Sequence, residues 1–275
     1  MNPRLPALAL GAALLLSACS AGPASLTSAA DAPGGAFDHD HAALDGLLAR
    51  HVLPDGVDYR GLAGESAELD RYLAALHAVG PDDLGAWDPD QRHAFWINVY
   101  NAHILRLIVD HVDEPPASIR DLGGAVVNRI WDQPLIPMAD LHPTGAGRDL
   151  SFSEVEHEIL RPRFEDARVH AAINCASTSC PPLLAEAYRA EVLDEQLDRA
   201  MAGFVADPTR NRLDAAAGRL ELSAIFDWFA EDFVRDAGSV REYVARYAPL
   251  ADADWILDAK VSYLDYDWSL NDASR

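Results

Sequence analysis

The residues best suited to covalent chemistry are Cys175 and Cys180, which enclose a short Ala-Ser-Thr-Ser segment. Pro181 follows Cys180 directly, and proline is typical of the first turn of a helix, so the sequence predicts a helix that Cys180 caps. At a helix N-terminus the dipole and the unpaired N–H groups stabilise a thiolate, the nucleophilic form of cysteine. Cys180 is therefore the better candidate nucleophile of the two.

A second interpretation of Cys175 and Cys180 is a disulfide that pins the loop between them, and a third is two inert, small apolar side chains. The number of cysteines does not distinguish a disulfide from a reactive thiol. Thiol–disulfide exchange is disfavoured, because the spacing is C-x4-C and not C-x-x-C.

A nucleophilic thiol needs a base within hydrogen-bond reach and a group that orients the base. His170 lies in segment 168–174, whose alternating residues predict a strand. His157 lies in a predicted helix, where Glu154 or the adjacent Glu156 can hold its imidazole in one tautomer. The alternative is that His157 bonds a backbone carbonyl and that Glu154 only caps the helix.

Two amides, Asn98 and Asn101, lie on one stripe of a helix predicted over 88–109. Apolar residues cover most of that helix, so it is expected to be buried, and buried amides must be hydrogen-bonded. They are expected to hold a loop near the cysteines, which is the favoured interpretation. The alternative is that Asn98 donates to an oxyanion during acyl transfer.

The Asp-His-Asp-His run at 38–41 invites a metal-binding interpretation. It stands at a predicted helix start, where aspartates suit the dipole, and no second ligand group accompanies it at a recognisable spacing. The chain also lacks H-E-x-x-H, a P-loop and a dinucleotide-binding turn. We therefore expect no metal ion and no cofactor. Near the C-terminus, Asp265, Asp267 and Trp268 can line a cleft, although packing on the surface is the commoner arrangement.

Capping signals and periodicity predict a helix-dominated α+β single domain with a small antiparallel sheet. The expected helices are 38–52, 66–79, 88–109, one starting at 151 or 153, one after Pro182, 191–205, one starting at 223, and 240–247. The expected strands are 135–138, 168–174, a hairpin around 213 and 220–222, and 261–263.

Six segments occur in a recognisable order: Val57–Arg60, Phe95–Asn101, Glu156–Arg161, Asn174–Leu183, Ser223–Trp228 and Tyr266–Asn271. Together they resemble the family called domain of unknown function 547, from about Asp38 to Asn271. The resemblance implies bacterial envelope proteins, with plant relatives that carry extra modules, and no particular activity. The family often has glycine where this chain has Ala176. The cysteine segment is also similar to the strand-to-helix nucleophile segment of papain-like proteases, although an aromatic residue follows the cysteine there.

The N-terminus has the layout of a secretory signal peptide: Arg4, an apolar run over 5–16 that is too short to span a bilayer, and then L-S-A-C. This ending resembles a bacterial lipobox, which implies cleavage after residue 18 and a lipid on Cys19. The alternative is an ordinary signal peptide that happens to contain a cysteine. Ser20, where some lipoproteins have aspartate, resembles lipoproteins that are sent to the outer membrane.

The net charge of −22 repels nucleic acids and anionic lipid headgroups, so no nucleic-acid partner is expected. Residues 19–36 are small and aperiodic, and they predict a flexible tether, which is followed by one globular domain over 37–272. No later apolar run is long enough to cross a bilayer. The lipid on Cys19 is therefore the expected membrane attachment, at the periplasmic face of the outer membrane.

The leading hypothesis is a thiol-dependent hydrolase or acyltransferase-like domain that acts on amide bonds of envelope material. In this hypothesis Cys180 is the nucleophile and His157 or His170 is the base. Glu154 or Glu156 orients the base, and Asn98 is the amide donor. The alternative is a non-catalytic binding or assembly module stapled by a Cys175–Cys180 disulfide. That alternative predicts bonded cysteines and no cleft that unites them with His157. Exposed tryptophan and tyrosine around a groove would favour it.

Overall fold

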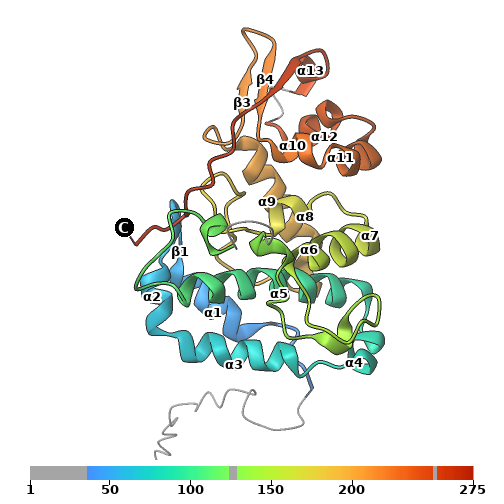
Figure 1. Cartoon of the computed structure of the whole chain (residues 1–275). Coiled ribbons are helices and arrows are strands. Elements are labelled where there is room, and N and C mark those ends of the chain that lie inside the picture. Colours follow the sequence, from blue (N-terminus) through green and yellow to red (C-terminus); the bar gives the residue numbers. More distant parts are fainter. Residues whose placement is uncertain (1–35, 124–128, 250–252, 275) are drawn as a thin grey trace, which may run out of the picture. The chain divides into compact units, whose positions relative to one another are not determined.

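The long helix α5, Pro89–Val109, is the centre of the N-terminal part of the fold (Figure 1). Asp88 accepts a hydrogen bond from the N–H of Gln91 at 2.8 Å, and the Gln91 side chain accepts one from the N–H of Asp88 at 3.1 Å. Pro89 occupies the first turn. Every residue from His93 to Leu105 is buried, so the prediction of a central, buried helix is confirmed.

The structure is a computed structural model that describes residues 36–123, 129–249 and 253–274. The predicted signal peptide, Cys19 and the tether up to residue 35 lie outside the described residues. Residues 36–275 form one compact unit. Among the described residues, no helix combines the length and the apolar character needed to span a membrane.

The first hydrophobic cluster contains α5, the elements that precede it and apolar residues from several later segments. The elements that precede α5 are α1 (Ala42–His51), β1 (Val52–Leu53), β2 (Gly56–Val57), α2 (Tyr59–Gly64), α3 (Ser66–His77) and α4 (Pro81–Ala86). β1 and β2 pair antiparallel, and α2 and α3 pack on α5. The helices predicted over 38–52 and 66–79 are confirmed, whereas α2 and α4 are too short to show a helical period.

The second hydrophobic cluster belongs to the C-terminal part of the chain. Its elements are α9 (Leu193–Ala206), β3 (Arg212–Asp214), β4 (Arg219–Leu222), α10 (Ile225–Trp228), α11 (Ala230–Ala237), α12 (Val240–Tyr247), α13 (Ala253–Ile256) and β5 (Lys260–Tyr263). β3 and β4 form the predicted hairpin, and β5 adds to β4 in parallel, so the three-stranded sheet is mixed. The α+β, helix-dominated class is confirmed.

The segment from Ile119 to Val192 consists of short turns of helix, and most of its buried apolar residues belong to the first cluster. The turns are η2 (Ile119–Leu122), η3 (Ile130–Asp132), η4 (Ala139–Leu141), α6 (Phe152–Glu154), the π-helical η5 (Val155–Leu160), α7 (Arg161–Phe164), α8 (Val169–Ala172) and η6 (Ala190–Val192). The strand expected over 135–138 is reduced to one antiparallel bridge between Ile136 and Leu150.

Two local predictions around the cysteines are wrong. The strand expected over 168–174 is in fact the helix α8. Val169 and Ala172 pack in the first cluster and Ala171 packs in the second, so the segment is buried on both sides. In a segment buried on both sides, alternating apolar residues do not indicate a strand. No helix forms over 181–189, since Pro182 disfavours a helical conformation at Pro181. The papain-like strand-to-helix arrangement is therefore absent from this described segment.

Residues 264–272, here called the C-terminal strap, run from β5 back to the first cluster (Figure 1). The strap pairs with three distant segments, through bridges between Ser177 and Leu270, Ser118 and Ser269, and Val57 and Asp272. It thereby crosses the cysteine loop and connects the two clusters.

Candidate functional site

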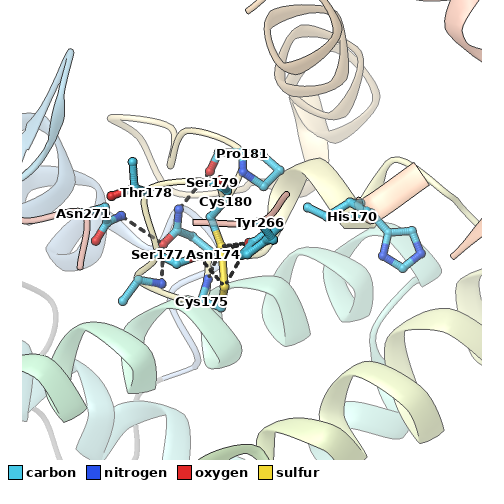
Figure 2. Close-up of a disulfide and its surroundings, with 12 residues drawn as sticks. His170, Asn174, Cys175, Ser177, Thr178, Ser179, Cys180, Pro181, Tyr266 and Asn271 are labelled. Atoms are coloured by element: carbon cyan, nitrogen blue, oxygen red, sulfur yellow. Dashed lines mark hydrogen bonds between the residues drawn. A yellow bond between two sulfur atoms is a disulfide. The ribbon is translucent and has the colours of Figure 1, made fainter. Parts of the chain in front are cut away.

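Cys175 and Cys180 form a disulfide (Figure 2). Their Cα atoms are 6.3 Å apart, and the N–H of Cys175 lies 3.0 Å from Sγ of Cys180. Cys180 is almost completely buried. Since no helix begins at Pro181, Cys180 lacks the helix N-terminus that was expected to activate it, and the disulfide alternative describes the loop in this structure.

Asn101 holds the chain just before the cysteines. Its side-chain N–H donates to the carbonyl of Ala172 at 2.9 Å, and its carbonyl oxygen accepts from the N–H of Asn174 at 2.9 Å. Asn174 continues the clamp, because its amide donates to the carbonyl of Pro181 and accepts from the N–H of Ala176, both at 2.8 Å. The structural role expected for Asn101 is therefore what the geometry shows.

Asn98 makes the same kind of clamp elsewhere. Its amide donates to the carbonyl of Tyr188 at 2.8 Å and accepts from the N–H of Tyr188 at 3.1 Å. Both ends of the amide are thus occupied by backbone at residue 188. The structure does not bring Asn98 to the cysteines, so the expectation that it donates to an oxyanion is replaced by a structural role.

The strap lies directly on the disulfide loop. The N–H of Thr178 donates to the carbonyl of Ser269 at 2.8 Å, and the N–H of Asn271 donates to the carbonyl of Ala176 at 3.1 Å. Ala176 has a φ of 58°, in the left-handed region that favours glycine. This conformation explains why the resembling family often has glycine at this position.

The strap delivers Tyr266 to the sulfur atoms (Figure 2). The hydroxyl of Tyr266 lies 3.2 Å from Sγ of Cys180 and 3.0 Å from Oγ of Ser177. Burial raises the pKa of Tyr266 to about 12, although the hydrogen bond from Ser177 opposes the rise. The phenol is therefore neutral at physiological pH and can donate its proton to the sulfur.

The disulfide forms part of the wall of a cavity of about 140 Å³, here called the aromatic cavity. Six of its lining residues are aromatic: Tyr100, Trp131, Trp228, Phe229, Tyr266 and Trp268. Ring centroids of Trp228 and Trp268 are 5.8 Å apart with nearly parallel planes, and those of Tyr266 and Trp268 are 4.5 Å apart. Trp228 is 48% exposed, so the aromatic surface is open to solvent at this edge.

The titratable groups that line the aromatic cavity are Glu156, His157 and His170. Glu156 and His157 lie in η5, the π-helical turn that follows the capping box of Ser151. π-helical turns are rare and often occur at functional sites. Four of the six predicted catalytic residues, Cys180 included, therefore line one cavity.

Glu156 is buried, and among the described residues its carboxyl group has no hydrogen-bond partner. Burial raises the pKa of Glu156 to about 7, a rise that Arg161 moderates and the charge of Asp232 reinforces. Its Oε1 lies 4.0 Å from Nδ1 of His170, beyond hydrogen-bond distance. Groups with such pKa values are frequent at functional sites.

His170 is held between an aromatic ring and a carboxylate. Its ring stacks on Phe229 with centroids 4.0 Å apart, and its Nε2 lies 2.7 Å from Oδ2 of Asp232. Burial lowers the pKa of His170 although Asp232 opposes the change, so the imidazole is neutral and donates from Nε2. In Figure 2 its ring points away from the disulfide, which does not suit a base for Cys180.

Asp232, the hydrogen-bond partner of His170, carries a negative charge. Burial would raise the pKa of Asp232, but hydrogen bonds from His170 and Arg161 hold it well below its usual range. Arg161 and Arg235 donate to the carboxylate at 2.6 and 2.8 Å. His157 accepts from Arg161 at 3.3 Å, and burial together with the Arg161 charge lowers the pKa of His157.

Glu154 does not orient His157, contrary to the expectation. Its carboxylate contacts Arg148 and lies 3.1 Å from Nε2 of His142, and it accepts from the N–H of Ser151 at 2.9 Å. Burial would raise the pKa of Glu154, but the hydrogen bonds from Arg148 and Ser151 lower it to about 2. The structure shows the alternative in which Glu154 caps the helix. The sequence did not indicate its ion-pair partners, Arg148 and His142.

The run at 38–41 also has a local role. Oδ2 of Asp38 accepts from the N–H of Ala42 at 3.0 Å, and Nδ1 of His41 lies 2.7 Å from the hydroxyl of Tyr72. Within the described residues, no group of three or more His, Cys, Asp or Glu side chains is arranged to hold a metal ion.

All six segments that carry the family resemblance meet around the strap and the aromatic cavity. Tyr100, Glu156, the cysteines, Trp228 and Tyr266 come from five of them and line the cavity. The sixth segment supplies Tyr59, whose hydroxyl donates to Oδ1 of Asn271 in the strap at 2.8 Å. This convergence locates the candidate site.

Comparison with known proteins supports the resemblance. Residues 84–205, which run from α4 to α9, match the model of a family described as Protein of unknown function, DUF547. No curated protein and no solved structure matches the chain.

Proposed function

We propose that this DUF547-like chain is a lipid-anchored envelope protein whose domain binds a ligand in the aromatic cavity, with the Cys175–Cys180 disulfide as a structural support. The observation that carries the proposal is the cavity itself, which is lined by six aromatic rings, opens to solvent at Trp228 and contains a buried carboxyl group. Ligand sites are commonly apolar and aromatic with a few polar groups. In the disulfide, neither sulfur is a free nucleophile.

The sequence of the N-terminus supports the location. The lipobox-like L-S-A-C ending supplies Cys19 for lipidation, and the small residues after it supply a tether. In this proposal the domain faces the periplasm at the outer membrane, and its ligand belongs to envelope material within reach of the tether.

Replacing Trp228 with alanine is expected to weaken ligand binding about tenfold, the loss of one aromatic contact. The ring is 48% exposed, so its removal is expected to leave the fold intact. Binding is measured with an exported chain that carries Cys19→Ser, by titrating soluble peptidoglycan fragments and recording tryptophan fluorescence. Tyr263→Ala is the matched control, because Tyr263 is an aromatic residue of similar exposure on β5, outside the cavity lining.

A saturable signal that weakens with Trp228→Ala and not with Tyr263→Ala supports the proposal. Equal weakening in both variants, or in neither, contradicts the assignment of the aromatic cavity as the binding site.

The thiol-dependent hydrolase is the second candidate, because Cys180 shares the cavity with His157, His170 and Glu156. The disulfide-stapled binding alternative predicts no cleft that unites the cysteines with His157, and this prediction is wrong, because His157 and both cysteines line the aromatic cavity. However, among the described residues no hydrogen bond joins an imidazole to either sulfur. Catalysis by Cys180 therefore requires both reduction of the disulfide and a movement of one histidine.

Alkylation separates the two candidates. We expect both cysteines of the exported Cys19→Ser chain to resist iodoacetamide until they are reduced, and Cys180 then to react no faster than Cys175, since Cys180 is 3% exposed. Labelled peptides are quantified by mass spectrometry. Faster labelling of Cys180 that slows in His157→Ala or His170→Ala would instead favour the hydrolase.

A further inference from the structure

Within the described residues, no arginine or lysine forms an ion pair with the carboxyl group of Glu156, although the charge of Arg161 acts on it at longer range. Arg161 donates through Nε to Asp232 and through Nη2 to Glu231, at 2.6 and 2.5 Å. His170 is neutral and turned toward Asp232, so the surrounding positive charge is already committed. A buried carboxylate without a partner is costly, and a ligand that supplies a positive charge would remove that cost.

The walls of the aromatic cavity suit a cation as well. The faces of aromatic rings are negative and attract ammonium and guanidinium groups. Two of these rings already contact a guanidinium group. Cζ of Arg120 lies 5.2 Å from the centroid of Trp268, and Cζ of Arg161 lies 5.1 Å from the centroid of Phe229. Trp228 carries no such cation in the described part of the chain, and it is open to solvent.

The size of the cavity limits what enters. A volume of about 140 Å³ is well below the roughly 300–1,000 Å³ of pockets that hold drug-sized ligands. It therefore accepts a small headgroup or the end of a side chain, with the remainder of the ligand outside.

From these observations we propose that the group bound in the aromatic cavity is an organic ammonium ion, paired with the carboxylate of Glu156 and stacked against the tryptophan rings. This inference rests on the proposed binding function and names its ligand class. Two envelope sources share this chemistry: the amine of a phospholipid headgroup and the side-chain amine of a peptide.

Binding of a cation is then linked to the loss of a proton from Glu156. Since the pKa of Glu156 is about 7, the carboxyl is mostly protonated at pH 6 and must ionise when a cation binds. Affinity is expected to rise about tenfold from pH 6 to pH 8. The titratable and charged groups that face Glu156 are His157 on its own turn, Arg161, His170, Asp232, Tyr100 and Tyr266.

The experiment follows the indole N–H signals by NMR in the exported Cys19→Ser chain. The first two probes are tetramethylammonium and tert-butanol, an uncharged analogue of similar shape. Two further probes distinguish the sources: ethanolamine represents the phospholipid headgroup, and N-acetyl-lysine amide represents the peptide side chain. We expect tetramethylammonium and one of the two amines to shift the signals of Trp228 and Trp268, and tert-butanol to bind at least tenfold more weakly. Glu156→Gln should remove this preference, whereas Glu195→Gln, a change at an exposed glutamate, should keep it.

The outcomes distinguish this inference from the function on which it rests. If peptidoglycan fragments bind but tetramethylammonium and tert-butanol bind equally, with no rise from pH 6 to pH 8, the ammonium assignment is overturned and the binding function stands. If neither the fragments nor any small probe shifts the tryptophan signals, both are overturned. Glu156→Asp, which keeps the charge, should retain the preference for the cation.

Discussion

Asn101→Ala is expected to lower the free energy of unfolding by about 3 kcal/mol, because it leaves the carbonyl of Ala172 and the N–H of Asn174 buried without partners. Both backbone groups lie immediately before the disulfide loop. The variant is therefore also expected to weaken ligand binding, through disorder of the loop on which the strap rests.

Urea unfolding followed by circular dichroism measures this loss. Gln133→Ala serves as the control, since Gln133 is a half-buried amide whose side chain has no hydrogen bond among the described residues, and a change below about 0.5 kcal/mol is expected there. A loss at Asn101 no larger than at Gln133 would show that the clamp does not stabilise the loop.

Glu156→Gln is expected to stabilise the domain at pH 8 by on the order of 3 kcal/mol, and to have little effect at pH 4. The pKa of Glu156 is raised from 4.5 to about 7 in the folded state. Between these values the folded chain binds the proton that the unfolded chain has lost, so stability falls as pH rises from 4.5 to 7. Above pH 7 the full cost of the buried charge is present, and glutamine removes it.

The measurement compares urea unfolding of the two proteins at pH 5, 6, 7 and 8. The difference should grow with pH and level off above 7, while Glu195→Gln shows no such trend. A constant difference across this range would mean that Glu156 titrates normally. A stabilised variant that has lost ligand binding is also the pattern expected of a residue kept for function at the expense of stability.

The elements that were predicted correctly carry local signals strong enough to decide their structure. α5 has Asp88 and Pro89 at its start and a long apolar period, and α12 begins at the capping residue Ser239. The predictions for α8 and for the segment after Cys180 are wrong. The conformation of α8 depends on its burial between two clusters, and that of the segment after Cys180 depends on two consecutive prolines.

The candidate site also contains residues that the sequence indicates and contacts that it does not indicate. Glu156, His157, His170 and Cys180 were recognised as chemically capable residues, and the cavity brings them together. The pairing of His170 with Asp232 spans 62 positions, and no pattern in one sequence signals such a contact. Trp228 and Trp268 lie in two of the six family-like segments, and the sequence already placed Trp268 as able to line a cleft, but only the tertiary fold shows that the two rings form one wall.

The strap makes the aromatic cavity one of the last parts of the domain to form. The hydroxyl of Tyr59 and Oδ1 of Asn271, which bond to each other, are 212 positions apart. A chain that has already formed α5 and its surrounding helices still lacks the wall that Tyr266 and Trp268 supply. Contacts of such long sequence separation form slowly, so the cavity is completed after the more local parts of the fold. A variant truncated before residue 264 would keep most of its hydrophobic core and lack this wall of the cavity.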